Sequence, residues 1–112
     1  MTLTVSASFS DEHGSHEVAL ESDLAGLERS RHAFYGSDWA VGLGLRLLPL
    51  LKRQDLEVCG DDLAALAAEV DVLLRAIQDR DDAQYWTVRL GNIRTAVALA
   101  EAHGGSGCVT IS

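Results

Sequence analysis

Residues 61–79 carry the feature that most constrains the fold, an apolar stripe with helical spacing. Its members recur every three or four positions, as on one face of an α-helix: Leu63, Leu66, Ala67, Val70, Leu73, Leu74 and Ile77. Polar residues fall on the other faces, where we expect water to reach them: Glu69, Asp71, Arg75 and Gln78. Asp61 is the predicted N-cap, because its carboxylate can accept from free amides of the first turn. Such a helix is stable only when its stripe is covered, so the rest of the chain must pack on it.

Strict alternation of apolar and polar residues predicts strands elsewhere. Residues 2–9 place every second side chain on an apolar side: Leu3, Val5, Ala7 and Phe9. Residues 16–21 alternate again after a polar turn at 11–15, which predicts a hairpin, although the turn could instead lead straight into a helix. Residues 56–59 predict a short extended piece. Residues 108–111 predict a third strand that pairs with residues 2–9.

Three further helices are expected. One runs from Ser22 to Gly36, a residue suited to a helix C-terminus. The next starts at Ser37 or Asp38, and Pro49 ends it. The last covers residues 82–103, with a capping box from Asp81 to Gln84 and a buried face that comprises Trp86, Leu90, Ile93, Val97 and Ala100. We therefore predict a single α+β domain over residues 1–112, in which four helices pack on a small antiparallel sheet made of the N-terminal hairpin and the C-terminal strand.

Composition narrows the class of protein. An apolar fraction of 47% fits a globular chain. No apolar run reaches the roughly 18–20 residues of a membrane span, and the first ten residues lack a secretory signal. These features predict a cytoplasmic protein, in which Cys59 and Cys108 would be reduced, small, buried apolar residues.

The formal net charge is −8 at pH 7, from 17 acidic and nine basic residues. Such a surface repels nucleic acid and anionic lipid, which need clustered lysine or arginine. It favours a basic partner, although acidic surfaces can serve solubility alone.

Motifs for catalysis are weak. His13 and His16 stand among acidic residues, but a zinc site needs a third and a fourth ligand. No cysteine or serine has the flanking pattern of a nucleophile. Residues 104–107 (Gly-Gly-Ser-Gly) follow a helix instead of preceding one, which is the wrong order for a phosphate loop. We therefore predict no catalytic residue, metal or cofactor, and keep a small metal-dependent enzyme or regulator using His13 and His16 as the alternative.

Two other groups of side chains have two interpretations each. Arg89 and Arg94 on the last helix suit either a partner contact or ion pairs with acidic residues. The aromatic residues around positions 35–39 and 85–86 suit either the core or an interface.

Residues 38–44 (Asp-Trp-Ala-Val-Gly-Leu-Gly), 47–51 (Leu-Leu-Pro-Leu-Leu) and 61–70 together resemble a known arrangement. It is that of small bacterial immunity proteins encoded beside polymorphic or contact-dependent toxins, in which a glycine and proline segment precedes a short link and a leucine-rich helix. The resemblance covers residues 36–78 and consists of core positions, and Leu48 stands where an aromatic residue often precedes the proline. It implies inhibition of one toxin by stoichiometric binding.

An acidic protein of this kind would bind a basic toxin surface. We expect the partner-binding residues to be Asp11, Glu12, Glu17, Glu21, Asp79, Asp81 and Asp82. A homodimeric scaffold that pairs through its apolar helices is a further alternative.

Overall fold

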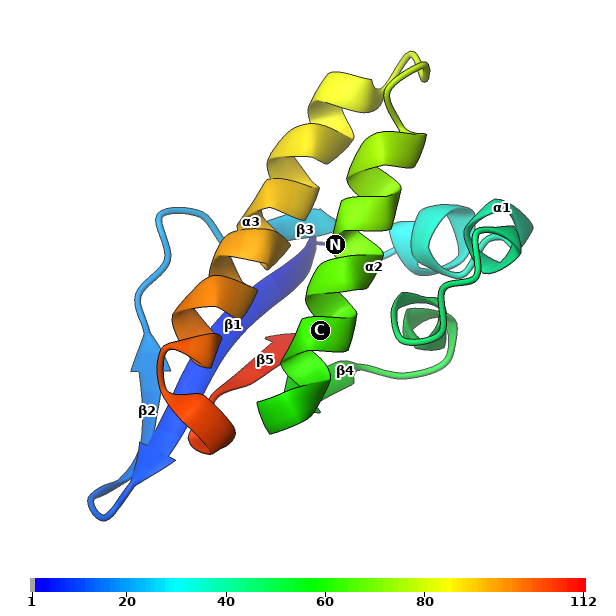
Figure 1. The fold of residues 1–112 in the computed structure, drawn as a ribbon. Helices are drawn as coiled ribbons and strands as arrows, with labels where there is room; N and C mark the ends of the chain where they lie inside the picture. The colour runs from blue at the N-terminus through cyan, green and yellow to red at the C-terminus, as the bar shows by residue number, and fades with distance from the viewer. Residues whose placement is uncertain (1) are drawn as a thin grey trace.

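Residues 2–112, which the computed structural model describes, form a layer of strands and a layer of helices (Figure 1). Within them, five strands make one antiparallel sheet in the order β2-β1-β5-β4, and β3 also pairs with β1. The strands are β1 (Thr2–Asp11), β2 (Gly14–Val18), β3 (Leu24–Leu27), β4 (Leu56–Cys59) and β5 (Cys108–Ile111). The α-helices are α1 (Asp38–Gly42), α2 (Leu63–Ala76) and α3 (Ala83–Glu101). The predicted α+β class with an antiparallel sheet is confirmed.

Strand β1 lies at the centre of the sheet. The predicted hairpin is confirmed, with β2 pairing along residues 7–11 of β1. The predicted C-terminal strand is also confirmed, because β5 pairs with β1 and places Ala7 opposite Val109. Leu3, Val5 and Ala7 are buried on the face that α2 and α3 cover, as their alternation predicts.

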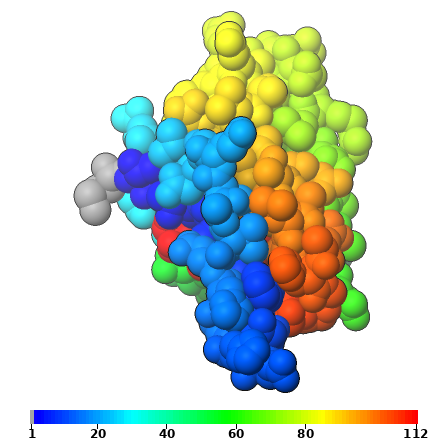
Figure 2. Space-filling model, turned by 90° about the vertical axis from the view of Figure 1, so that its left-hand side faces the viewer, coloured from blue at the N-terminus to red at the C-terminus, as the bar shows by residue number. Residues whose placement is uncertain are grey.

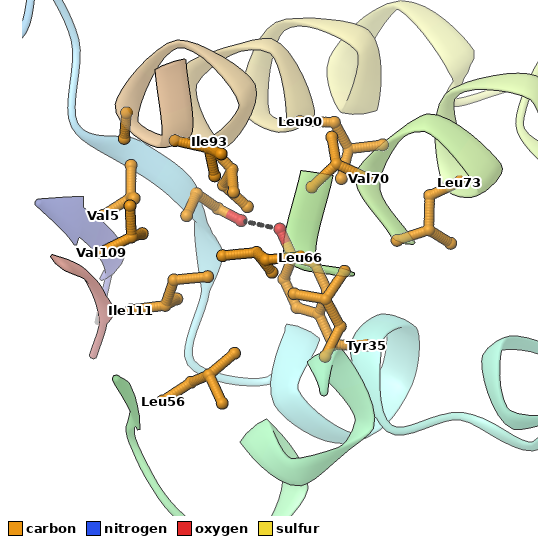
Figure 3. Close-up of a cluster of buried hydrophobic side chains, with 14 of the residues drawn as sticks. Val5, Tyr35, Leu56, Leu66, Val70, Leu73, Leu90, Ile93, Val109 and Ile111 are labelled. Atoms are coloured by element: carbon orange, nitrogen blue, oxygen red, sulfur yellow. Dashed lines mark hydrogen bonds between the residues drawn. The ribbon is translucent and has the colours of Figure 1, made fainter. Parts of the chain in front are cut away.

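The core lies between this sheet face and the two long helices. Figure 3 shows side chains of α2 and α3 converging on those of the strands. Except for Leu74, which is only half-buried, the predicted stripe of α2 is buried, and so is the predicted face of α3. The buried residues are Leu63, Leu66, Ala67, Val70, Leu73 and Ile77 from the first segment, and Trp86, Leu90, Ile93, Val97 and Ala100 from the second. Burying a leucine or isoleucine contributes about 1.5–3 kcal/mol, so this face accounts for much of the stability.

The count of four helices is wrong, because residues 22–36 do not form one. They form strand β3 and a single turn of π-helix, η1 (Arg31–Tyr35). Gly26 sits in β3 with φ of +134°, a value that favours glycine, and Val5 N–H donates to the carbonyl oxygen of Asp23 at 2.8 Å. Pairing with the edge of β1 therefore outweighs the local helical spacing.

The helix expected from position 38 to 50 is also shorter than predicted. Helix α1 ends at Gly42, and Gly44 follows with φ of +88°. A 3₁₀ turn, η2 (Leu48–Lys52), then begins with Pro49 in its first turn. The carboxylate of Glu69 accepts the backbone N–H groups of residues 46–48 at 2.9–3.1 Å, which satisfies amides at the start of η2.

The predicted caps of the long helices are not found. A 3₁₀ turn, η3 (Gly60–Asp62), precedes α2, so Asp62 is its N-cap instead of Asp61. Asp82 is the N-cap of α3, which rules out the capping box from Asp81. Neither N-cap side chain bonds a first-turn amide among the described residues. The last 3₁₀ turn, η4 (Gly104–Ser106), connects α3 to β5.

The prediction of two reduced cysteines is contradicted, because Cys59 and Cys108 form a disulfide. They stand directly opposite each other on β4 and β5, with Cα atoms 4.1 Å apart. They are 49 residues apart in the chain. Only the strand register makes them neighbours.

Candidate partner-binding surface

Negative charge is concentrated at the start of the chain. The residues before Arg29 include no lysine or arginine but six carboxylates: Asp11, Glu12, Glu17, Glu21, Asp23 and Glu28. They belong to β1, β2 and the connections that follow β1, β2 and β3. Glu28 pairs with Arg31 just beyond this stretch, whereas Glu17, Glu21 and Asp23 take part in no ion pair among residues 2–112.

A groove lies where the chain leaves the sheet between β2 and β3. Both strands pair with β1, but residues 19–22 between them make no backbone–backbone hydrogen bond within the described chain. The resulting groove has a volume of about 750 Å³, and its lining includes Thr4, Ser6, Glu17, Glu21 and Asp23. Figure 2 shows the hairpin and this connection, in blue to light blue, running beside α3, in yellow to orange. We call this feature the hairpin groove.

The groove continues onto the sheet face opposite α2 and α3, which we call the outer face. The register places polar residues there in pairs: Ser8 with Glu17, Ser6 with Thr110, and Glu57 with Thr110. The serine and threonine side chains are half-buried, and both glutamates are exposed. The outer face therefore carries hydroxyl groups at its centre and a carboxylate toward each side.

Two of the predicted residues, Glu17 and Glu21, line the hairpin groove. Asp11 and Glu12 lie farther out, at the tip of the hairpin (Figure 1). Asp11 accepts from the ring of His16 at 2.9 Å and from the backbone N–H of His13 at 2.8 Å. These bonds, that of His16 first, hold the pKa of Asp11 below its ordinary value. The tip carboxylate is thus already engaged inside the chain.

The other three predicted residues do not join this surface. Asp79, Asp81 and Asp82 lie at the turn between α2 and α3, at the opposite end of the molecule from the hairpin tip (Figure 1). The hairpin tip and this turn lie toward opposite ends of a molecule that is 45 Å long. Arg80 also donates to Asp82 at 2.8 and 3.0 Å, which lowers the pKa of Asp82.

Asp23 and Glu57 belong to the acidic side but were missing from the prediction. The sequence offered a signal for Asp23, since it falls within the stretch that lacks lysine and arginine. For Glu57 the signal was the alternation of Leu56 and Val58, which points the residue between them away from the core. Its position relative to β1 required the strand order.

No protein-family model matches the chain, and neither a curated protein nor a solved structure does. None of the helices in residues 2–112 is long and apolar enough to cross a membrane.

The histidines of the metal alternative have other contacts. His16 bonds Asp11 and stacks on Phe9, with ring centroids 5.1 Å apart, and His103 stacks on Phe9 at 3.7 Å. His13 is exposed, 3.5 Å from Glu12. Residues 2–112 contain no group of three side chains arranged to hold a metal ion.

The arginine and aromatic residues of the helical side are mostly structural. Arg94 of α3 pairs with Asp71 of α2 at 3.3 Å, so of the two interpretations of this residue the structure has the ion pair. Arg89 lies over the ring of Tyr85, 3.9 Å from its centroid. Trp86 is buried and stacks on Phe34 at 3.6 Å.

Tyr35 also belongs to the core. It is buried and donates to the carbonyl oxygen of Ala25 at 2.7 Å, the bond drawn in Figure 3. Burial raises the pKa of Tyr35. Trp39 is the most exposed of these rings at 36%, and the guanidinium of Arg80 covers it at 4.7 Å.

Proposed function

We propose that this chain binds a basic protein partner through the hairpin groove and the outer face. We further propose that the partner is a bacterial toxin, neutralised by stoichiometric binding without chemistry. The small immunity proteins that residues 36–78 resemble act in this way. Because such a toxin is neutralised inside the cell that produces it, we propose that the chain acts in the cytoplasm.

The observation that carries the proposal is the set of free carboxylates on one side of the molecule. Glu17, Glu21, Asp23 and Glu57 take part in no ion pair among residues 2–112. Lysine and arginine residues of a partner can pair with them without breaking an internal ion pair. Complementary charge also speeds association and disfavours acidic partners.

The carboxylates at the α2–α3 turn are a weaker choice for the same role. Only Asp79 and Asp81 take part in no ion pair there, because Asp82 is already paired with Arg80 and a basic partner would have to compete with that bidentate contact. This end also lacks a neighbouring polar sheet face. We therefore assign the partner to the hairpin side.

The experiment compares two triple charge reversals in the intact chain. The first is Glu17→Lys, Glu21→Lys and Asp23→Lys. The matched control is Asp38→Lys, Asp79→Lys and Asp81→Lys, which makes the same change in net charge at α1 and the α2–α3 turn, away from the groove. Each variant is tested for binding to the product of the neighbouring gene by titration calorimetry, and circular dichroism checks the fold.

We expect the first variant to lose at least about a hundredfold in affinity, because several rim and groove charges change sign together. The control should bind with the affinity of the wild type. Wild-type affinity in the first variant would refute the assigned surface. No binding by the wild-type chain would refute the toxin as partner, and light scattering on the chain alone then tests the homodimer.

A further inference from the structure

The disulfide lies on the outer face of the sheet, which the helices leave uncovered. Cys59 ends β4 and Cys108 begins β5, and Cys108 stands opposite Ser8 on β1. Ser8, Cys108 and Cys59 therefore form one row across the outer face, which α2 and α3 do not cover. Both cysteines are half-buried. Attack on a sulfur atom needs access, and this position provides it.

Other contacts besides the disulfide hold β4 and β5 together. On β4, Leu56 and Val58 are buried and pair with Ile111 and Val109 of β5. Beyond the cysteines, the N–H of Gly60 donates to the carbonyl oxygen of Gly107 at 3.0 Å. Breaking the sulfur–sulfur bond thus leaves the strand pair in place, and the effect falls on the adjoining turns η3 and η4.

We propose that Cys59 and Cys108 are a redox modification site, which thiols reduce and small-molecule disulfides re-form by the reverse exchange while the protein stays folded. A thiolate attacks one sulfur, the disulfide bond breaks, and the other cysteine leaves as a thiolate that takes a proton from solvent. A second thiol attacks the mixed disulfide and releases the second cysteine. The reductant ends as a disulfide, so two electrons pass to the protein.

The neighbouring charges select among reductants. Glu57 lies two residues before Cys59 on the same outer face, and Asp61 and Asp62 follow in η3. All three side chains are exposed. A cationic thiol approaches this site more easily than an anionic one, because the carboxylates attract the first and repel the second. Salt weakens both effects.

This proposal does not depend on the proposed function, because it is tested on the purified chain alone. The protein is purified without reductant and treated in native buffer with 2-mercaptoethylamine, 2-mercaptoethanol or 3-mercaptopropionate. Samples are quenched in acid, alkylated and weighed by mass spectrometry. Each rate is divided by the rate of the same thiol on hydroxyethyl disulfide, which removes differences in intrinsic reactivity.

We expect complete reduction without denaturant, with the cationic thiol faster than the anionic one by about tenfold at low salt. Circular dichroism should be unchanged, and loss of amide protection should be confined to η3, η4 and the ends of β4 and β5. Glu57→Gln should lower the ratio of the cationic-thiol rate to the anionic-thiol rate by about twofold. Asp79→Asn, beyond the far end of α2, should leave this ratio unchanged.

Three results would overturn the proposal. Reduction that requires denaturant would make the disulfide purely structural. Two free thiols that resist mild oxidation would mean that the bond does not form. Unfolding on reduction, seen by circular dichroism in the wild type and in the Cys59→Ser/Cys108→Ser variant alike, would remove the folded dithiol state.

Discussion

Replacing both cysteines by serine measures how much the disulfide stabilises this fold. The bond joins residues 49 apart and closes a loop that contains α2 and α3. Chain entropy lost by the unfolded state over a loop of this length corresponds to about 4 kcal/mol at 25 °C. Urea unfolding followed by circular dichroism gives the free energy of unfolding of both forms by linear extrapolation. We expect the variant to be less stable by about 3–4 kcal/mol, since residual structure in the unfolded chain lowers the entropic gain.

The matched control is the wild-type protein unfolded in the presence of dithiothreitol. It lacks the cross-link but keeps both sulfur atoms, so it separates loop entropy from the effect of serine. The two measurements should agree within about 1 kcal/mol. A loss of less than about 1 kcal/mol in both would refute the reasoning, because it would mean that the loop is already closed in the unfolded state.

Three further changes test separate parts of the structure. Glu69→Gln removes the charge that holds three consecutive amides at the start of η2 and should cost about 2 kcal/mol in urea unfolding. Gly26→Ala should cost about 1–3 kcal/mol, because φ is +134° and the new Cβ would lie 3.1 Å from the ring of Trp86. Asp82→Asn tests pH dependence. Arg80 holds the folded-state pKa of Asp82 below 3.8, so this contact stabilises the fold above that pH and is lost as the pH falls through the folded-state pKa. The variant should therefore lose less stability on acidification than the wild type.

Long, regular patterns in the sequence were read correctly. The stripe of α2 spans four turns, and no strand period fits it. The alternation of β1 likewise assigns Leu3, Val5 and Ala7 to the core. In both elements the local pattern and the tertiary environment favour the same conformation, which is why propensity and periodicity sufficed.

Residues 22–36 were misread because local and tertiary preferences disagree there. Leu24 and Leu27 have helical spacing, but residues 2–5 of β1 offer an edge with unpaired backbone groups. Pairing with that edge satisfies them, and Gly26 adopts a backbone conformation that other residues disfavour. No local signal in the sequence reports how much edge β1 leaves open after β2 ends.

The acidic residues of the candidate surface can be counted from the sequence, but their grouping in space cannot be predicted from it. The sequence analysis placed Glu17 and Asp79 in one partner-binding group, although they lie on different parts of the molecule. Conversely, Glu57 is distant in sequence and belongs on the same sheet face as Glu17. The disulfide depends on strand register in the same way, because only the pairing of β4 with β5 brings Cys59 and Cys108 together. The sequence instead predicted reduced cysteines, because a reducing compartment was expected.

The disulfide and the acidic outer face share strands, which links their energetics. A partner that contacts both Glu17 and Glu57 spans β2, β1, β5 and β4, and the disulfide joins the last two of these strands. If reduction changes the affinity for such a partner by some factor, the bound partner must change the reduction equilibrium by the same factor. Measuring the affinity of both redox forms and the reduction equilibrium with and without the partner tests whether the partner senses β4, without a further substitution. A change in affinity on reduction requires a partner that senses β4 or the adjoining turns η3 and η4, whereas an unchanged affinity means that the partner does not sense the bond.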